Sequence, residues 1–141
     1  MSLCFLSLET SKVFNKLILN NLTEAGYDGL SDALIILFPY IDDSDGITSA
    51  QLAKEVGYTR QAMHKNIKKL EELGYVKLLQ YNLKKKVIVF TQKGKKLMED
   101  ANSYILQVER ELSNLVGEEE LQRYKKTQIK LHDYLNTLQT S

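Results

Sequence analysis

Positively charged and amide side chains recur at helical spacing near the middle of this 141-residue chain. Three apolar residues spaced i, i+4 and i+7 predict the buried face of a helix: Met63, Ile67 and Leu70. At 100° per residue, Gln61, Lys65 and Lys68 lie on the opposite face, and Thr59 can cap the first turn. Ammonium groups donate hydrogen bonds to anionic oxygens, and an amide both donates and accepts. The pattern predicts a helix that is held by one face and binds an anionic partner with the other.

The positive charge is concentrated in this part of the chain. Residues 60–96 contain eleven Lys or Arg and two Glu, a net charge of +9, whereas the whole chain carries +1. Such segregation favours an anionic partner for the segment. The alternative is a solvated lysine-rich surface without a partner. Because the charge coincides with one structural unit, we favour the first interpretation.

The sequence gives little indication of catalysis or of metal, cofactor or membrane binding. No glycine-rich phosphate loop or nucleophile motif is present, so we do not expect an enzyme. His64 and His132 lack neighbours at metal-ligand spacing, and the single cysteine, Cys4, allows no intrachain disulfide, so we expect neither metal nor cofactor. Apolar residues make up 43% and charged residues 26% of the chain, as in soluble globular proteins. No apolar run approaches the ~20 residues of a membrane span, and no secretory signal is recognised, so we expect a cytoplasmic protein without membrane contact.

Two helices are predicted ahead of the basic region. Leu3–Leu22 forms the first, and the apolar segment Ala33–Phe38 forms a second that is central to the core. Pro39 should kink or end this second helix, because proline donates no backbone hydrogen bond.

A helix-turn-helix and a hairpin are predicted next. Thr48-Ser49-Ala50-Gln51 has the spacing of a capping box, and the helix it opens stops at Gly57, just before the basic helix. The basic helix ends at Gly74, a left-handed cap. Val76–Gln80 and Lys86–Phe90 are strand-like, and residues 81–85 between them form a polar tip. A helix-turn-helix followed by such a hairpin is a winged helix.

Two long helices complete the chain after Thr91, which can cap the first of them. Its predicted core positions are Leu97, Ala101, Tyr104, Ile105, Val108, Leu112 and Leu115. Gly117 interrupts the pattern, and Glu118–Glu120 place negative charge where the dipole of the last helix favours it. That helix has a heptad-like seam of Leu121, Tyr124, Gln128, Leu131, Leu135 and Leu138. The seam predicts either a dimer contact or packing on its own domain.

The order of these elements resembles the MarR family of bacterial winged-helix transcription regulators over nearly the whole chain. Leu70–Val76, LEELGYV, is similar to the family's helix-to-wing junction, and Phe90–Gly94, FTQKG, to its wing-to-helix junction. The resemblance implies a mainly α fold with a small β-hairpin wing. It also implies a single MarR-like domain over 1–141, with the winged-helix DNA-binding region at 31–96 and dimerisation helices at 1–22 and 97–141.

The resemblance further implies a homodimeric regulator, of repressor type, that binds double-stranded DNA. A recognition helix from each subunit would enter successive major grooves of a pseudo-palindromic operator. Gln61 suits adenine, and Arg60 or Lys65 suits guanine, although Arg60 also suits the DNA backbone. Ser49, Lys68 and the wing lysines suit phosphates. The predicted DNA-binding residues are Ser49, Thr59, Arg60, Gln61, Ala62, His64, Lys65, Lys68, Asn82, Lys84, Lys85 and Lys86.

The wing departs from the family's pattern at two positions. Where the family commonly has Asp-x-Arg, with the arginine entering the minor groove, this chain has Asn82 and Lys84. Positive charge is kept, but the Asp–Arg ion pair and the planar guanidinium are lost. We expect less shape-selective reading of the minor groove, with the lysines acting mostly on phosphates.

Effector control is also implied by the resemblance. Such regulators are often released from DNA by a small aromatic ligand bound between the dimer helices and the winged domain. Phe14, Tyr40 and Tyr104 are candidate contacts, although aromatic residues at this spacing also suit a core. A redox branch of the family has one cysteine near the start of its first helix, as Cys4 is here. Leu8 and Ile18 stand where that branch has supporting tyrosines. We therefore favour an apolar role for Cys4 without redox sensing.

The rival function is a winged-helix module for protein–protein contact, in which the basic face docks an acidic partner. Steep weakening of duplex binding with salt distinguishes DNA binding from this alternative.

Overall fold

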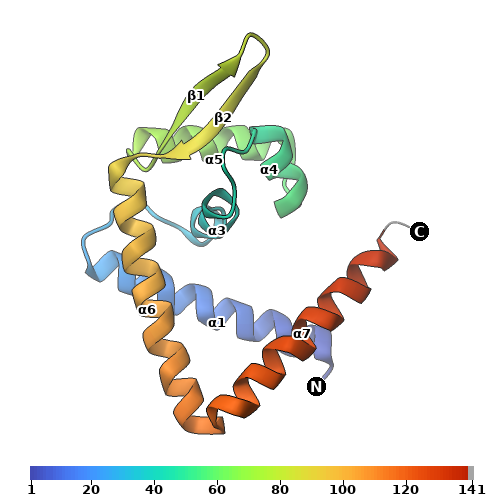
Figure 1. Ribbon diagram of the computed structural model, residues 1–141. Helices are drawn as coiled ribbons and strands as arrows, with labels where there is room; N and C mark the ends of the chain where they lie inside the picture. The colour runs from blue at the N-terminus through green and yellow to red at the C-terminus, as the bar shows by residue number, and fades with distance from the viewer. Residues whose placement is uncertain (140–141) are drawn as a thin grey trace. The chain divides into compact units, whose positions relative to one another are not determined.

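The computed structural model describes residues 1–139 as a mainly helical chain with one two-stranded antiparallel hairpin (Figure 1). This confirms the predicted fold class. The chain divides into two compact units, Met1–Asn102 and Ser103–Ser141, and the helix α6 runs across the boundary between them. The last two residues of the predicted 97–141 segment lie outside the described residues. None of the described helices is long and apolar enough to span a membrane.

The first helix, α1 (Leu3–Glu24), matches the predicted Leu3–Leu22 closely. The Ser2 hydroxyl caps it by accepting from the Phe5 N–H at 3.0 Å. It ends in a Schellman motif, in which Gly26 has φ 96° and the Tyr27 N–H donates to the Leu22 carbonyl at 3.0 Å. The chain is thereby turned back toward the core at Tyr27.

Two short helices replace the single predicted helix at 33–38. They are α2 (Asp32–Ile35) and α3 (Phe38–Asp42), and Pro39 lies in the first turn of α3. The predicted interruption near Pro39 is present, since α2 ends at Ile35 and a new helix begins at Phe38. Pro39 lies just inside this new helix, because a first-turn residue needs no N–H and the fixed φ of proline suits a helix start. The expected central position is confirmed, since both helices bury most of their apolar side chains: Leu34, Ile35, Phe38 and Ile41.

The helix-turn-helix consists of α4 (Ser49–Val56) and α5 (Arg60–Glu72). Both bonds of the capping box are present between Thr48 and Gln51, and Gly57 adopts the left-handed conformation at φ 85°. These local features confirm the predicted bounds, because each depends on residues only a few positions apart.

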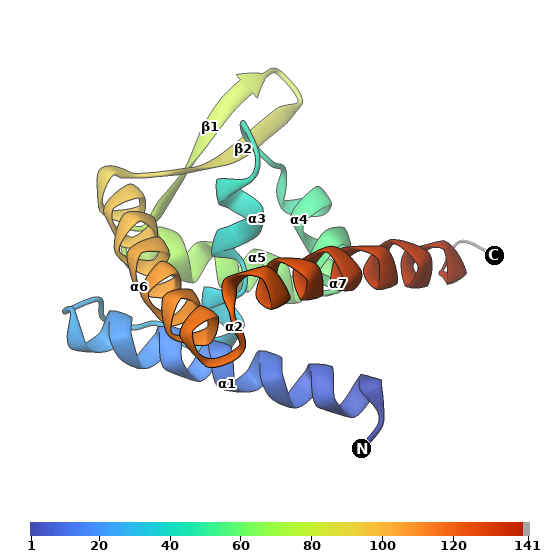
Figure 2. The same cartoon turned by 60° about the horizontal axis from the view of Figure 1, so that its bottom comes forward.

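The hairpin is longer than predicted. Strands β1 (Val76–Asn82) and β2 (Lys85–Phe90) pair from Val76↔Phe90 to Asn82↔Lys85. The predicted five-residue tip therefore shrinks to Leu83 and Lys84. A shift in register between Gln80 and Asn82 accompanies this tight turn and leaves Tyr81 as a bulge. The hairpin projects beyond α5 in both ribbon views (Figures 1 and 2).

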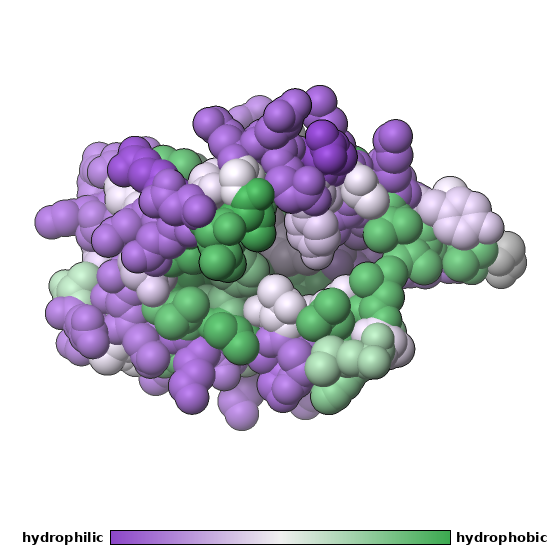
Figure 3. Space-filling model, turned by 90° about the horizontal axis from the view of Figure 1, so that it is seen from below, coloured by the Kyte–Doolittle hydropathy of each residue, from purple (hydrophilic) through white to green (hydrophobic). Residues whose placement is uncertain are grey.

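The chain ends in α6 (Gln92–Val116) and α7 (Glu118–Leu138), separated by Gly117 at φ 94°. Leu97 and Ala101 are buried as predicted, but Leu115 is 79% exposed, so its assignment to the core of this chain was wrong. No residue of α7 is buried. Exposed apolar side chains, drawn in green, are visible on the surface in Figure 3.

Candidate nucleic-acid interface

The helix α5 presents a polar, basic face to solvent. Met63, Ile67 and Leu70 form its apolar stripe, and they are 0%, 3% and 0% exposed. Their burial fixes the rotation of the helix about its axis. The predicted contact residues of this region are exposed: Thr59, Arg60, Gln61, Ala62, His64, Lys65 and Lys68. The structure therefore gathers these residues on one helix, where their donors and acceptors are free to meet an external partner.

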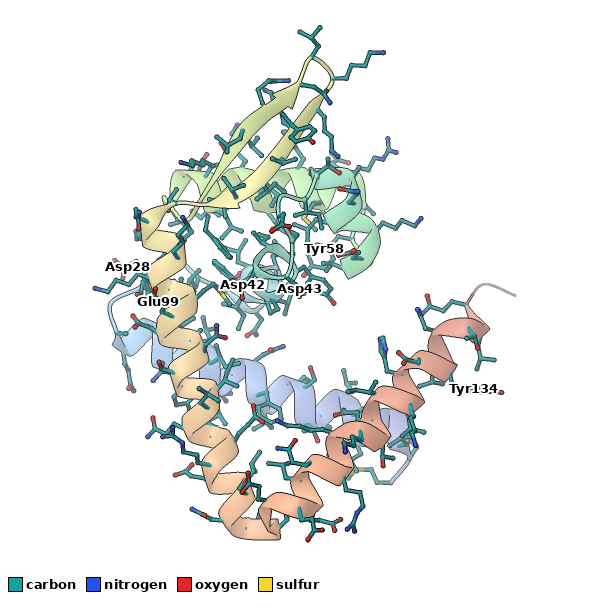
Figure 4. The ribbon with its side chains drawn as sticks, in the orientation of Figure 1. Asp28, Asp42, Asp43, Tyr58, Glu99 and Tyr134 are labelled. Atoms are coloured by element: carbon teal, nitrogen blue, oxygen red, sulfur yellow. The ribbon has the colours of Figure 1, made fainter. Side chains whose placement is uncertain are left out.

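The start of α5 is held by two side chains. The Thr59 hydroxyl accepts from the Ala62 N–H at 3.1 Å and caps the helix as predicted. The Tyr58 hydroxyl donates to the Ala33 carbonyl at 3.2 Å, which ties the turn to the start of α2. Tyr58 is labelled in Figure 4. Burial raises the pKa of Tyr58 above its ordinary value, so the phenol stays a hydrogen-bond donor at neutral pH. Ser49, a predicted phosphate contact, is half-buried at the first position of α4.

Carboxylates do not neutralise the basic segment. Ion pairs among residues 1–139 join Lys12 to Glu9, Arg123 to Glu120, Lys125 to Glu109 and His132 to Asp133. None of these involves a residue between Arg60 and Lys96. A net charge of +9 over residues 60–96 is thus left without internal ion pairs in the described chain. Unpaired positive charge on one surface attracts anions and gains from releasing their counterions.

The wing tip carries the second group of predicted contacts. Lys84 and Lys86 are exposed, and the Lys85 Nζ lies 5.4 Å from the centroid of the Tyr81 ring, a cation–π contact. Asn82 has a structural role, because its Oδ1 accepts from the Lys84 N–H at 2.9 Å and holds the turn. Leu83, which no sequence motif marks as a contact, lies fully exposed between them.

The two junctions that resemble the MarR family meet in space and set the angle of the wing. The Thr91 hydroxyl donates to the Gly74 carbonyl at 2.6 Å and accepts from the Gly94 N–H at 3.1 Å. The Thr91 N–H donates to the Tyr75 carbonyl at 3.1 Å, and the Lys93 Nζ donates to the Leu73 carbonyl at 2.9 Å. The end of α5, the base of the hairpin and the start of α6 are therefore joined by one hydrogen-bonded cluster, which we call the junction cluster.

The predicted effector contacts are not brought together around the cavity in the first unit. A depression of about 390 Å³ lies beside the hairpin and the turn after α3, and its lining includes Asp42, Lys77 and Lys95. Phe14, Tyr40 and Tyr104 do not line it. Phe14 is half-buried on α1, Tyr40 is 39% exposed on α3, and Tyr104 belongs to the second unit. Cys4 is exposed on α1.

Metal-binding chemistry has no visible site in the part of the chain that the structure describes. No group of three or more His, Cys, Asp or Glu residues there could hold an ion.

Comparison with known proteins finds a family likeness in the segment that contains α4 and α5. Residues 29–80, from just before α2 through most of β1, match the sequence model of the MarR family. None of the curated proteins compared with the chain matches it.

Solved structures of MarR-family regulators share the fold over nearly the whole chain. The Staphylococcus aureus MepR–DNA complex has a TM-score of 0.74 and 20% identity, covering 96% of this chain and 98% of that chain. Wild-type MarR from E. coli in its apo form has a TM-score of 0.72 and 19% identity, covering 93% and 97%. A MarR/EmrR family regulator from Acinetobacter sp. ADP1 has a TM-score of 0.68 and 19% identity, covering 94% and 96%. At these identities the likeness establishes the fold.

Proposed function

We propose that this chain, a winged helix-turn-helix protein of the MarR family, is a transcription regulator that binds double-stranded DNA as a homodimer. The observation that carries the proposal is the unpaired positive charge on α5 and the wing. An exposed helix of about 10–12 Å diameter also fits the width of the major groove. One of the structures with the same fold is a complex with DNA.

In this proposal, some exposed side chains contact the bases and others contact the phosphates. Gln61 can pair with adenine through two hydrogen bonds, and Arg60 or Lys65 can donate to the O6 and N7 atoms of guanine. Ala62 and His64 stand next to these residues and complete the base-facing surface. Phosphates are bound by Ser49, Thr59, Lys68 and the wing lysines, Lys84 to Lys86, and these contacts set the position of the protein without reading the sequence.

Homodimerisation is proposed from the apolar surface that the single chain leaves in water. Leu3, Leu6 and Leu17 on α1 are 57%, 49% and 39% exposed, and Leu131 and Leu135 on α7 are 42% and 55% exposed. Exposed leucines repeated along each of these helices leave apolar surface in water, which marks an interaction surface in soluble proteins. A two-fold dimer places two copies of α5 on one duplex and accounts for a pseudo-palindromic operator.

We further propose that binding to the operator blocks transcription and that a small aromatic ligand reverses it. Phe14 and Tyr40 in the first unit, and Tyr104 in the second, are each candidate contacts for such a ligand. If no ligand releases the protein from DNA, the proposed DNA binding still stands.

The experiment that tests the proposal is a salt titration of binding to a random-sequence duplex. With four lysine–phosphate contacts in each subunit, about eight per dimer, log K should fall against log salt with a slope of about −7. Lys68→Ala should flatten the slope by about 2, because each subunit loses one contact. Lys12→Ala is the matched control, since Lys12 already pairs with Glu9 at 3.1 Å and should leave the slope unchanged.

A flat slope for the wild-type chain, or no duplex binding at low salt, would favour the rival function, in which the basic face docks an acidic protein.

A further inference from the structure

The tip of the wing exposes a leucine to water completely. Leu83 has 101% relative exposure, the highest value among the large exposed apolar residues of the chain. An isobutyl group in that position gains nothing from the fold of its own chain. Its apolar surface becomes favourable only when a partner removes it from water.

Side-chain interactions hold this tip in shape. The Asn82 Oδ1 accepts from the Lys84 N–H at 2.9 Å, and the Gln80 side-chain amide donates to the Asn82 carbonyl. The Lys85 ammonium lies over the Tyr81 ring on the same hairpin. Because every non-glycine residue described has a negative φ, the turn holds Leu83 without backbone strain. A pre-organised tip loses little conformational entropy when it binds.

The surroundings of Leu83 indicate the chemistry of its partner. Lys84 and Lys86 are exposed beside it, and neither has a carboxylate partner in the described chain. An apolar side chain flanked by two ammonium groups fits a narrow groove, because the apolar group can contact apolar walls while the ammonium groups bind anionic rims. The minor groove of duplex DNA, about 6 Å wide and lined by deoxyribose, has this character.

We propose that Leu83 is an apolar wedge that enters the minor groove beside each recognition helix, while the adjacent lysines bind the phosphates on its rims. This inference rests on the proposed DNA binding and adds a contact that carries no charge. Apolar side chains at such positions contact sugars and widen or unstack base steps, so they respond to the deformability of the sequence. Leu83 thus supplies shape recognition where the wing lacks an arginine.

The test compares Leu83→Ala and Lys84→Ala in the full-length protein bound to its best duplex from a selected pool. Leu83→Ala should weaken binding by about tenfold or more, because the dimer loses the contact of three carbons in each subunit. Its slope of log K against log salt should equal that of the wild type. Lys84→Ala should instead flatten the slope by about 2 per dimer. Hydroxyl-radical footprinting should show that Leu83→Ala loses protection of the minor groove beside each half-site.

Leu83→Lys separates the wedge from a purely electrostatic wing. The added charge would tighten binding if the tip acted only on phosphates, whereas loss of the apolar group should leave binding weaker than wild type at moderate salt. Since Leu83 is fully exposed, all three variants should keep the wild-type melting temperature.

Wild-type affinity and an unchanged footprint for Leu83→Ala would overturn the wedge. That result leaves the proposed function intact, because the wild-type protein would still bind DNA in the same assay. Failure of the wild type to bind any duplex would overturn the proposed function itself and the wedge with it.

Discussion

At the scale of single residues, one hydrogen bond links the end of α1 to α6. The Tyr27 hydroxyl donates to the Asp100 Oδ2 at 2.5 Å, and Tyr27 is 8% exposed. Burial, followed by the hydrogen bond and the negative charge of Asp100, raises the pKa of Tyr27 to about 12. The neutral phenol is therefore favoured by the folded state.

This shift predicts how stability depends on pH. The unfolded tyrosine titrates near its ordinary value of 10.0, whereas the folded one titrates at about 12. The folded state thus holds a proton that the unfolded state has lost, and the free energy of unfolding should fall as pH rises through this window. Below pH 10 the contribution is fully present.

Tyr27→Phe measures this contribution. The variant should lose about 1–3 kcal/mol of unfolding free energy at neutral pH, because it breaks a hydrogen bond to a charged group. Its loss relative to wild type should shrink between pH 10 and pH 12 in urea titrations. Tyr134→Phe is the control, since Tyr134 is 67% exposed and its substitution should change little. A constant difference between wild type and Tyr27→Phe across this pH range would contradict the assignment.

Local sequence predicts some of these residue contacts and misses others. The caps at Thr48 and Thr59 are visible in the sequence because each acts on an N–H three residues away. Tyr27 and Asp100 are 73 positions apart, and nothing in the pattern of the chain pairs them. Leu83 was missed for a different reason, since a leucine in a polar turn marks neither a core nor a site.

At the scale of elements, the junction cluster determines where the wing stands. Gly94 is buried in α6, and a Cβ there would lie 2.1 Å from the Tyr75 carbonyl oxygen and 2.9 Å from the Phe90 ring. The glycine is required for close approach between helix and hairpin base. The two segments that resemble family motifs are thus in contact both through the hydrogen bonds of the junction cluster and through this close approach.

Gly94→Ala should be strongly destabilising. The new methyl group meets backbone, which cannot move aside without shifting α6, so we expect a loss of about 3 kcal/mol in denaturant unfolding. Gly57→Ala is the matched control: a Cβ there meets nothing within 4 Å, and only its φ of 85° opposes the change. That variant should lose about 1 kcal/mol. Equal losses for the two substitutions would show that the contact at Gly94 is looser than the structure indicates.

Element boundaries followed from the sequence where the determinants are local. Glycines at the ends of α4 and α5 and the polar caps at their starts predicted these helices to within a residue or two. Pro39 predicted an interruption near the break between α2 and α3, but not its position after Ile35. The bulge at Tyr81 was not predicted, because strand pairing determines it. Leu115 shows the same limit, since helical periodicity identifies an apolar face but not the chain that covers it.

At the scale of the whole molecule, charge and apolar surface are segregated along the chain. The basic segment at 60–96 lies in the first unit, and α7 in the second unit buries no residue of its own. In our account the first surface meets DNA and the second meets another copy of the chain. Sequence periodicity anticipated the seam on α7, but periodicity alone does not distinguish packing on its own domain from dimerisation.

Selection from a random duplex pool by the full-length protein tests whether a symmetric dimer reads DNA through α5. We expect a pseudo-palindromic sequence whose half-sites are centred about 10–10.5 base pairs, or a multiple of this, apart. Gln61→Ala should change the preferred bases within each half-site, whereas Lys68→Ala should weaken binding to all sequences alike. A pool without enrichment, or a single unpaired motif that neither substitution alters, would contradict the account.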